Sequence, residues 1–114
     1  MMSDWKGLLQ QVMGRVTELG ELSPKTRGGY KMLHEAGAEA KHLDLKTREL
    51  IALAVAVTTR CDGCIANHTQ KAIALGTSRQ EIAEALGVAV AMNAGAALAY
   101  SGRVMDAYEA FAGK

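Results

Sequence analysis

The stretch DLKTRELIALAVAVTTRCDGCIANH, residues 44–68, contains the features that decide the fold. Asp44 is a typical N-cap residue and predicts a helix from Leu45 to about Thr59. The segment Leu50–Val57 is apolar on every face of this helix, so we expect the helix to be buried on all sides. The stretch therefore predicts a buried helix that is followed directly by the two cysteines.

Both cysteines and one of the three histidines lie within eight residues, 61–68, shortly after this helix. In a helix that begins at about Cys61, the spacing i, i+3 and i+7 places Cys61, Cys64 and His68 within about 60° of one another. Cys61 would lie in the first turn, where free backbone N–H groups and the helix dipole favour a thiolate. His68 would be placed to exchange a proton with Cys64. The pattern predicts a dithiol site with a nearby base, on a helix that ends at Gly76.

Three other interpretations of the cysteines stay open at this point. They could form a structural disulfide, they could bind zinc together with His68, or they could be inert residues of a buried helix. The zinc site lacks a nearby fourth ligand, because His34 and His42 lie well upstream. A thioredoxin-like fold is not indicated, since the chain has no strand pattern.

The composition indicates one small domain, residues 1–114, of the all-α class. Hydrophobic residues make up 49% of the chain but aromatic residues only 4%, which suits close helix packing better than a sheet. A formal net charge of +1, with both signs interspersed, predicts no nucleic-acid and no membrane partner. The N-terminus has no pattern of a secretory signal, so we expect a cytoplasmic protein.

The N-terminal third predicts two helices. Ser3 is a candidate N-cap for the first, which we expect to run to about Leu19 and to end at Gly20. Ser23-Pro24 then predicts the start of the second, because proline is favoured at the first helical position.

The C-terminal third predicts further helices, about five to six in the whole chain. Ser78 to Glu81 has the spacing of a capping box, and from there we expect two helices that meet near Asn93–Gly95 and end near Phe111. The segment Leu86–Tyr100 is rich in Ala and Gly and has hardly a polar atom. One chain of this size can hardly cover so much apolar helix surface, so we expect a homo-oligomer.

Glu49, followed by eleven residues and then by Cys61-x-x-Cys64-x-x-x-His68, resembles the alkyl hydroperoxidase D (AhpD) and carboxymuconolactone decarboxylase superfamily. The resemblance is close over residues 64–69, 72–77 and 81–85, and looser over residues 33–108. It implies an AhpD-like all-α fold and assembly into homo-oligomers, commonly hexamers or trimers. The decarboxylases proper lack the cysteine pair, so the chain looks like the cysteine-containing branch.

The resemblance also implies roles for four residues. Cys64 matches the thiol that attacks the peroxide, and Cys61 matches the resolving thiol. His68 matches the base, and Glu49 matches the far end of a proton relay. Some members carry a second histidine between the cysteines, where this chain has Gly63.

Glu49 has two interpretations from the sequence alone. It opens the apolar segment of its helix, where a buried carboxylate needs a partner; alternatively, it is a solvated residue of the first turn. A tight connection near Thr59-Arg60 predicts antiparallel helices, which brings Glu49 and His68 near enough for a hydrogen bond, directly or through one water.

The activity implied by the resemblance is that of a thiol–disulfide oxidoreductase with alkyl hydroperoxide reductase (peroxidase) activity, in antioxidant defence. Its substrate would be a hydroperoxide, and its reductant a dithiol on a lipoyl-bearing or thioredoxin-like protein. No organic cofactor and no metal are implied. The alternatives are a decarboxylase-type lyase that acts on a small lactone with His68 and Glu49, and a zinc-stabilised oligomeric scaffold.

Overall fold

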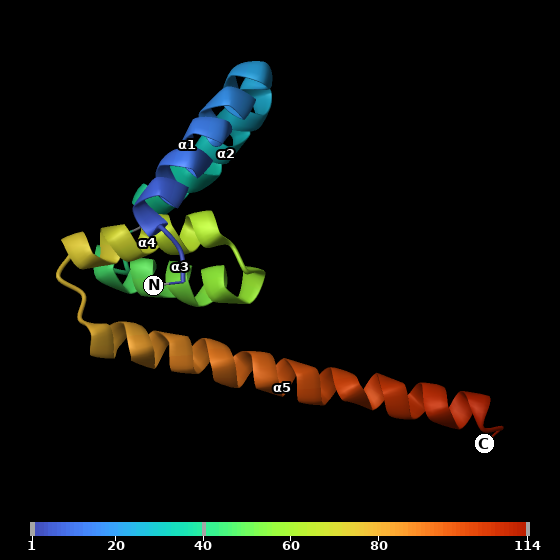
Figure 1. The fold of residues 1–114 in the computed structure, drawn as a ribbon. Coiled ribbons are helices and arrows are strands. Elements are labelled where there is room, and N and C mark those ends of the chain that lie inside the picture. Colours follow the sequence, from blue (N-terminus) through green and yellow to red (C-terminus); the bar gives the residue numbers. More distant parts are fainter. Residues whose placement is uncertain (1, 40, 114) are drawn as a thin grey trace.

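The computed structural model describes residues 2–39 and 41–113, and its described residues form five helices and no strand (Figure 1). The all-α fold class predicted from the sequence is therefore confirmed. The helices are α1 (Trp5–Leu22), α2 (Pro24–Ala38), α3 (Leu45–Thr59), α4 (Asp62–Ala74) and α5 (Arg79–Phe111).

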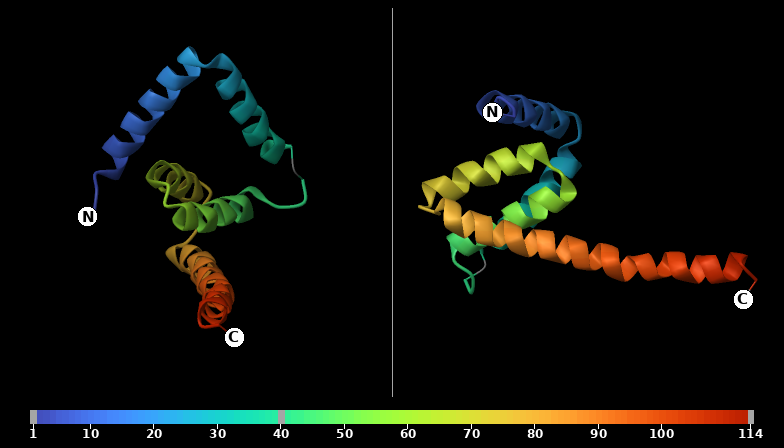
Figure 2. Two further views of the ribbon diagram at one scale, coloured as in Figure 1. Left: turned by 90° about the vertical axis from the view of Figure 1, so that its right-hand side faces the viewer. Right: turned by 60° about the horizontal axis from the view of Figure 1, so that its bottom comes forward.

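The helices pack in an open series, in which each helix contacts the next in the order α2, α1, α4, α3, α5. Helices α1 and α2 form a hairpin, and α1 touches α4. Helix α3 lies between α4 and α5, and α5 continues far beyond α3 as a single rod (Figures 1 and 2). Among the described residues the hairpin and α5 do not pack on each other, so the single chain does not close into a bundle.

The core of the single chain is thin. Its Cα radius of gyration is 18.8 Å, whereas a compact domain of this length would have about 13 Å. The expectation that α3 is buried on all sides is wrong for the single chain, because α4 and α5 cover only part of its surface. Ile51 and Val55 of α3 remain 48% and 54% exposed. The buried apolar residues are Leu53, Ala56, Ala66, Ala72 and Ala89.

The first helix differs from its prediction at both ends. Its N-cap is Asp4, whose carboxylate accepts a hydrogen bond of 3.2 Å from the backbone N–H of Gly7, and not Ser3. The helix continues past Gly20, because this glycine lies against α2 and does not serve as a helix end. A Cβ added to Gly20 would lie 2.8 Å from Cδ of Arg27, so the missing side chain makes room for α2. Pro24 starts α2 at its first position, as predicted.

Helix α5 is one helix of 33 residues, so the predicted break near Asn93–Gly95 is wrong. An interior glycine destabilises a helix by about 1 kcal/mol relative to alanine. This is too little to end the helix among the surrounding Ala, Leu and Val residues. Asn93 does not interrupt the helix either, because its side-chain amide donates a 2.7 Å hydrogen bond to the carbonyl of Ala89. The predicted capping box of Ser78 and Glu81 is confirmed, with hydrogen bonds of 3.1 and 3.0 Å.

The C-terminal half of α5 exposes large apolar side chains. Leu98 is 79% exposed and Phe111 is 93% exposed. Within the described part of the chain, α5 is the one helix that is long and apolar enough to cross a membrane by length and composition. A helix that is covered by a second protein chain passes the same test, so this is weak evidence for a membrane.

Candidate active site at the start of helix α4

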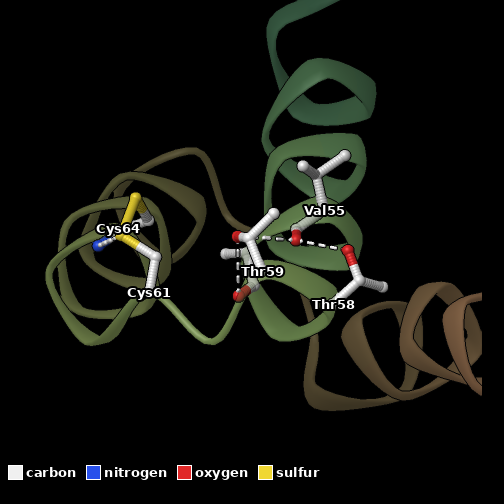
Figure 3. The surroundings of a disulfide bond; sticks show 6 residues. Val55, Thr58, Thr59, Cys61 and Cys64 are labelled. Carbon is white, nitrogen blue, oxygen red and sulfur yellow. Dashed lines mark hydrogen bonds between the residues drawn. A yellow bond between two sulfur atoms is a disulfide. The ribbon is translucent and has the colours of Figure 1, made fainter.

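The chain reverses sharply between α3 and α4. The hydroxyls of Thr58 and Thr59 donate hydrogen bonds of 2.7 and 3.1 Å to the carbonyl of Val55, in the last turn of α3 (Figure 3). Arg60 then ends α3 in the left-handed region, with φ 55° and ψ 45°. This conformation costs a residue other than glycine about 1–2 kcal/mol. The turn brings α4 back along α3, and the first cysteine follows it immediately.

Cys61 was predicted to lie in the first turn of α4, but it is the N-cap of this helix. Its backbone is extended, with φ −98° and ψ 96°, and its sulfur accepts a hydrogen bond of 3.1 Å from the backbone N–H of Cys64. The sulfur therefore fills the role that an Asp or Ser oxygen usually has at an N-cap.

The two cysteines are joined by a disulfide bond (Figure 3). The Cα atoms of Cys61 and Cys64 lie 5.2 Å apart, which is a normal distance for a disulfide. Both residues are half-buried. A disulfide or dithiol here lies at the positive end of the α4 dipole, which stabilises a thiolate when the bond is reduced.

Helix α1 covers the disulfide loop on one side, which the sequence analysis did not predict. A Cβ added to Gly63, between the cysteines, would lie 2.9 Å from a methyl carbon of Val12. A side chain at this position would press against Val12 unless Val12 or α1 shifted. Gly63 inside a helical segment was the one sequence signal of this close approach.

Glu49 and His68 meet between α3 and α4. Oε2 of Glu49 lies 2.6 Å from Nδ1 of His68, and the two side chains are 18% and 22% exposed. The predicted hydrogen bond is confirmed, and Glu49 is not the solvated residue of the alternative interpretation. A carboxylate at Nδ1 fixes the orientation of the ring and favours the tautomer with the proton on Nδ1. Nε2 then remains for exchange of a proton with a reacting group.

The four predicted site residues thus form two pairs: Cys61 and Cys64 at the start of α4, and Glu49 of α3 with His68 one turn further along α4. Within the described part of the chain, no hydrogen bond joins the His68 ring to either sulfur. The arrangement combines a redox-active sulfur pair with a half-buried imidazole–carboxylate pair, so it can exchange electrons with thiols and move protons nearby.

The structure does not support the zinc interpretation. No three His, Cys, Asp or Glu side chains come together as a metal site in residues 2–39 and 41–113.

Two similar proteins with full-length matches come from bacteria. An uncharacterised protein of Haemophilus influenzae is 51% identical over 95% of this chain and 96% of its own length. An uncharacterised protein of Cupriavidus necator is 27% identical over 96% of this chain and 97% of its own length.

Solved structures share the fold. A carboxymuconolactone decarboxylase family protein from Legionella pneumophila matches with a TM-score of 0.73 and 34% identity, over 96% of this chain and 98% of that chain. A protein from Methanobacterium thermoautotrophicum matches with a TM-score of 0.67 and 31% identity, over 74% of this chain and 94% of that chain. The sequence model of the carboxymuconolactone decarboxylase family matches residues 29–107, which include all four site residues. The superfamily predicted from the sequence is therefore confirmed, and the chain belongs to the carboxymuconolactone decarboxylase family.

Proposed function

We propose that the protein is a thiol–disulfide oxidoreductase with alkyl hydroperoxide reductase activity, acting in antioxidant defence in the cytoplasm. The observation that carries this proposal is the Cys61–Cys64 disulfide at the N-terminus of α4, one turn from a histidine that is hydrogen-bonded to a carboxylate. A disulfide stabilises a fold mainly by constraining the unfolded chain. This one joins residues only three apart in the sequence, so it would stabilise the fold little.

The proposed reaction starts from the reduced dithiol. His68 takes the proton of the Cys64 thiol, and the thiolate attacks the outer oxygen of a hydroperoxide. The O–O bond breaks, Cys64 becomes a sulfenic acid, and the alkoxide takes the proton from His68 to leave as an alcohol. The Cys61 thiol then attacks the Cys64 sulfur, which forms the disulfide and releases water. Cys61 is well placed for this second step, since it stands at the N-cap beside Cys64.

A dithiol would regenerate the protein. One thiolate of a lipoyl group or of a thioredoxin-like protein attacks the Cys61–Cys64 bond, and its second thiol resolves the mixed disulfide. Two electrons and two protons pass to the cysteines, and the partner leaves as a disulfide. Both cysteines are half-buried and not fully buried, which is consistent with access by such a partner.

A thiol titration tests the reaction class. The reduced chain holds two thiols, and we expect one equivalent of an alkyl hydroperoxide to remove both, with one alcohol formed per disulfide. The same chain unfolded in denaturant is the control, because its thiols lack the helix and His68. A folded protein that reacts no faster than the unfolded control contradicts the proposal and favours the decarboxylase-type lyase.

We also propose that the chain works as a single-domain homo-oligomer, a hexamer or a trimer, with α5 in the interface. Ile82, Leu86 and Ala89 are among the less exposed residues of α5 and lie on the part that packs on α3. The same helical face continues, at a spacing of 3.6 residues, to Tyr100 and Phe111. These two side chains are 71% and 93% exposed in the single chain, and a second copy would cover them.

A charge on this face is expected to weaken assembly. The wild-type protein should sediment well above 12.1 kDa, and Val104→Lys, on the exposed continuation of the face, should move the distribution toward single chains. Glu109→Lys is the control, because Glu109 lies on the opposite side of α5. A wild-type protein that remains a 12.1 kDa monomer at micromolar concentration would contradict the proposed oligomer.

A further inference from the structure

We propose that Glu81 is a positioning residue of the candidate site: by holding Lys46, it leaves the carboxylate of Glu49 to His68. The inference deepens the proposed function and rests on the Glu49–His68 pair described above. Ion pairs join α3 to α4 and to α5, the helices on either side of it.

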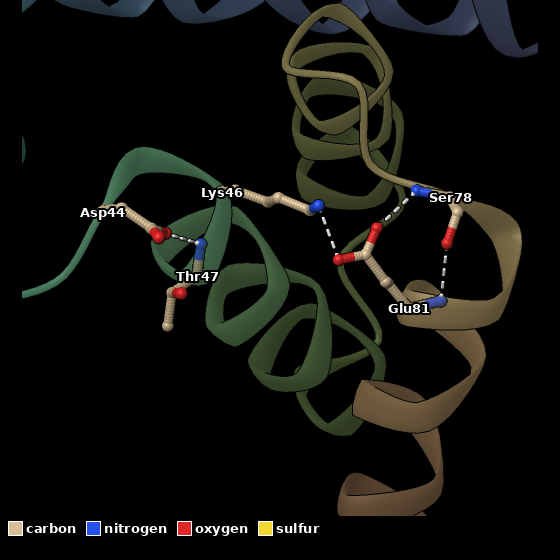
Figure 4. Close-up of polar contacts among 5 residues, drawn as sticks. All are labelled: Asp44, Lys46, Thr47, Ser78 and Glu81. Atoms are coloured by element: carbon tan, nitrogen blue, oxygen red, sulfur yellow. Dashed lines mark hydrogen bonds and ion pairs between the residues drawn. The ribbon is translucent and has the colours of Figure 1, made fainter.

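Lys46 and Glu81 connect α3 to the first turn of α5. Nζ of Lys46 lies 2.6 Å from Oε2 of Glu81, and the side chains are 37% and 38% exposed (Figure 4). The other oxygen of Glu81 accepts a 3.0 Å hydrogen bond from the backbone N–H of Ser78. Lys46, with a smaller contribution from the Ser78 N–H, holds the pKa of the Glu81 carboxyl below its ordinary value. Glu81 is therefore charged at neutral pH and held in place from two sides.

The start of α3 holds Lys46 itself in position. Asp44 accepts a 2.7 Å hydrogen bond from the backbone N–H of Thr47, which fixes the first turn of the helix (Figure 4). This hydrogen bond lowers the pKa of Asp44, so the cap remains charged at neutral pH.

Two of the four ion pairs among the described residues join different helices, and both begin on this part of α3. Lys46 reaches α5 and Glu49 reaches α4. Lys46 and Glu49 are three residues apart on one helix, so their side chains are neighbours on its surface. The structure pairs the Lys46 ammonium with Glu81. Because Lys and Glu at this spacing on one helix can form an ion pair, we infer that Glu49 is a second carboxylate that Lys46 can reach.

The competition matters because, among the described residues, the half-buried His68 is the one hydrogen-bond partner of the Glu49 carboxylate. A free Lys46 would turn toward Glu49, which is 18% exposed and so attracts a cation more strongly than a fully solvated carboxylate does. The His68 ring would then share its acceptor with an ammonium group. Glu81 prevents this exchange, and it does so from α5 without touching the site.

Glu81→Gln tests this role without removing the helix cap. Glutamine at this position still reaches the backbone N–H of Ser78, as in a capping box, but it no longer neutralises Lys46. The readout is the Nδ1 proton of His68 in ¹⁵N-histidine-labelled protein, which resonates downfield and exchanges slowly while it is bonded to a carboxylate. We expect Glu81→Gln to lose most of this signal and the double variant Lys46→Met/Glu81→Gln to restore it.

Two single variants complete the set. Glu49→Gln should shift the signal upfield, because an amide oxygen accepts a weaker hydrogen bond than a carboxylate, and Lys46→Met should leave it unchanged. An unchanged signal in Glu81→Gln overturns the inference, as does a signal that is lost in both Glu81→Gln and the double variant, because Glu81 would then act through the fold alone. The measurement needs no hydroperoxide and no thiol chemistry, so a failure of the proposed peroxidase activity would be seen separately.

Discussion

Cys64→Ser is expected to abolish the reaction with hydroperoxide, whereas Cys61→Ser should stop it halfway. In Cys61→Ser the Cys64 thiolate still attacks the peroxide, but no second thiol captures the product, so a sulfenic acid should accumulate. In Cys64→Ser the remaining Cys61 thiol should form neither a sulfenic acid nor an intramolecular disulfide. Trapping with dimedone, followed by mass spectrometry, distinguishes the two variants.

The structure gives a reason for this asymmetry. Cys61 is the N-cap, and its sulfur already accepts a hydrogen bond from the backbone N–H of Cys64. Cys64 lies on the helix four residues before His68, on the side where an imidazole can take its proton. If the two variants trap dimedone equally, the assignment of attacking and resolving thiols is wrong.

Most helix starts could be predicted from local signals, but the ends of α1 and the continuity of α5 could not. Pro24 and the Ser78–Glu81 capping box marked helix starts correctly, because these signals act within one turn. Gly20 and the Asn93–Gly95 segment were read as breaks, although both lie inside helices. Gly20 is used for contact with α2, and a contact between helices is not encoded in the local pattern.

The residues of the site could be predicted from the sequence more completely than the contacts that surround them. The spacing of Glu49 and His68 about a tight turn was enough to bring them together, since two antiparallel helices of known rise leave little freedom. The N-cap position of Cys61 was missed, because it depends on the left-handed conformation of Arg60. The contacts of Gly63 with Val12 and of Lys46 with Glu81 were also missed, because each joins residues far apart in the sequence.

Glu49→Gln is expected to slow the alkylation of Cys64 near neutral pH. When the His68 ring takes the proton of Cys64, a carboxylate at Nδ1 stabilises the positive charge that the ring acquires, and this charge in turn stabilises the nearby thiolate. Glutamine keeps the size of the side chain but removes its charge, so the imidazolium and the thiolate both become less favourable. The helix dipole still favours the thiolate at the start of α4, so the effect should be partial, about three- to tenfold in rate.

The effect on the fold should be small. Glu49 lies in the first turns of α3 and its carboxylate contacts only His68 among the hydrogen bonds of the described residues. Glutamine can still accept a hydrogen bond from Nδ1–H, so no buried polar group is left without a partner. Helix content and sedimentation should therefore match those of the parent protein.

The decisive measurement is the pH profile of iodoacetamide alkylation at Cys64 in the Cys61→Ser background, with and without Glu49→Gln. The profile should move to higher pH in Glu49→Gln, because the thiolate needs a higher pH to form once its supporting charge is gone. Glu84→Gln is the matched control: Glu84 is an exposed residue of α5 with no ion pair in the described part of the chain, so its profile should not move. Superimposable profiles for Glu49→Gln and its parent would remove Glu49 from thiol activation and leave this role to His68 and the N-terminus of α4.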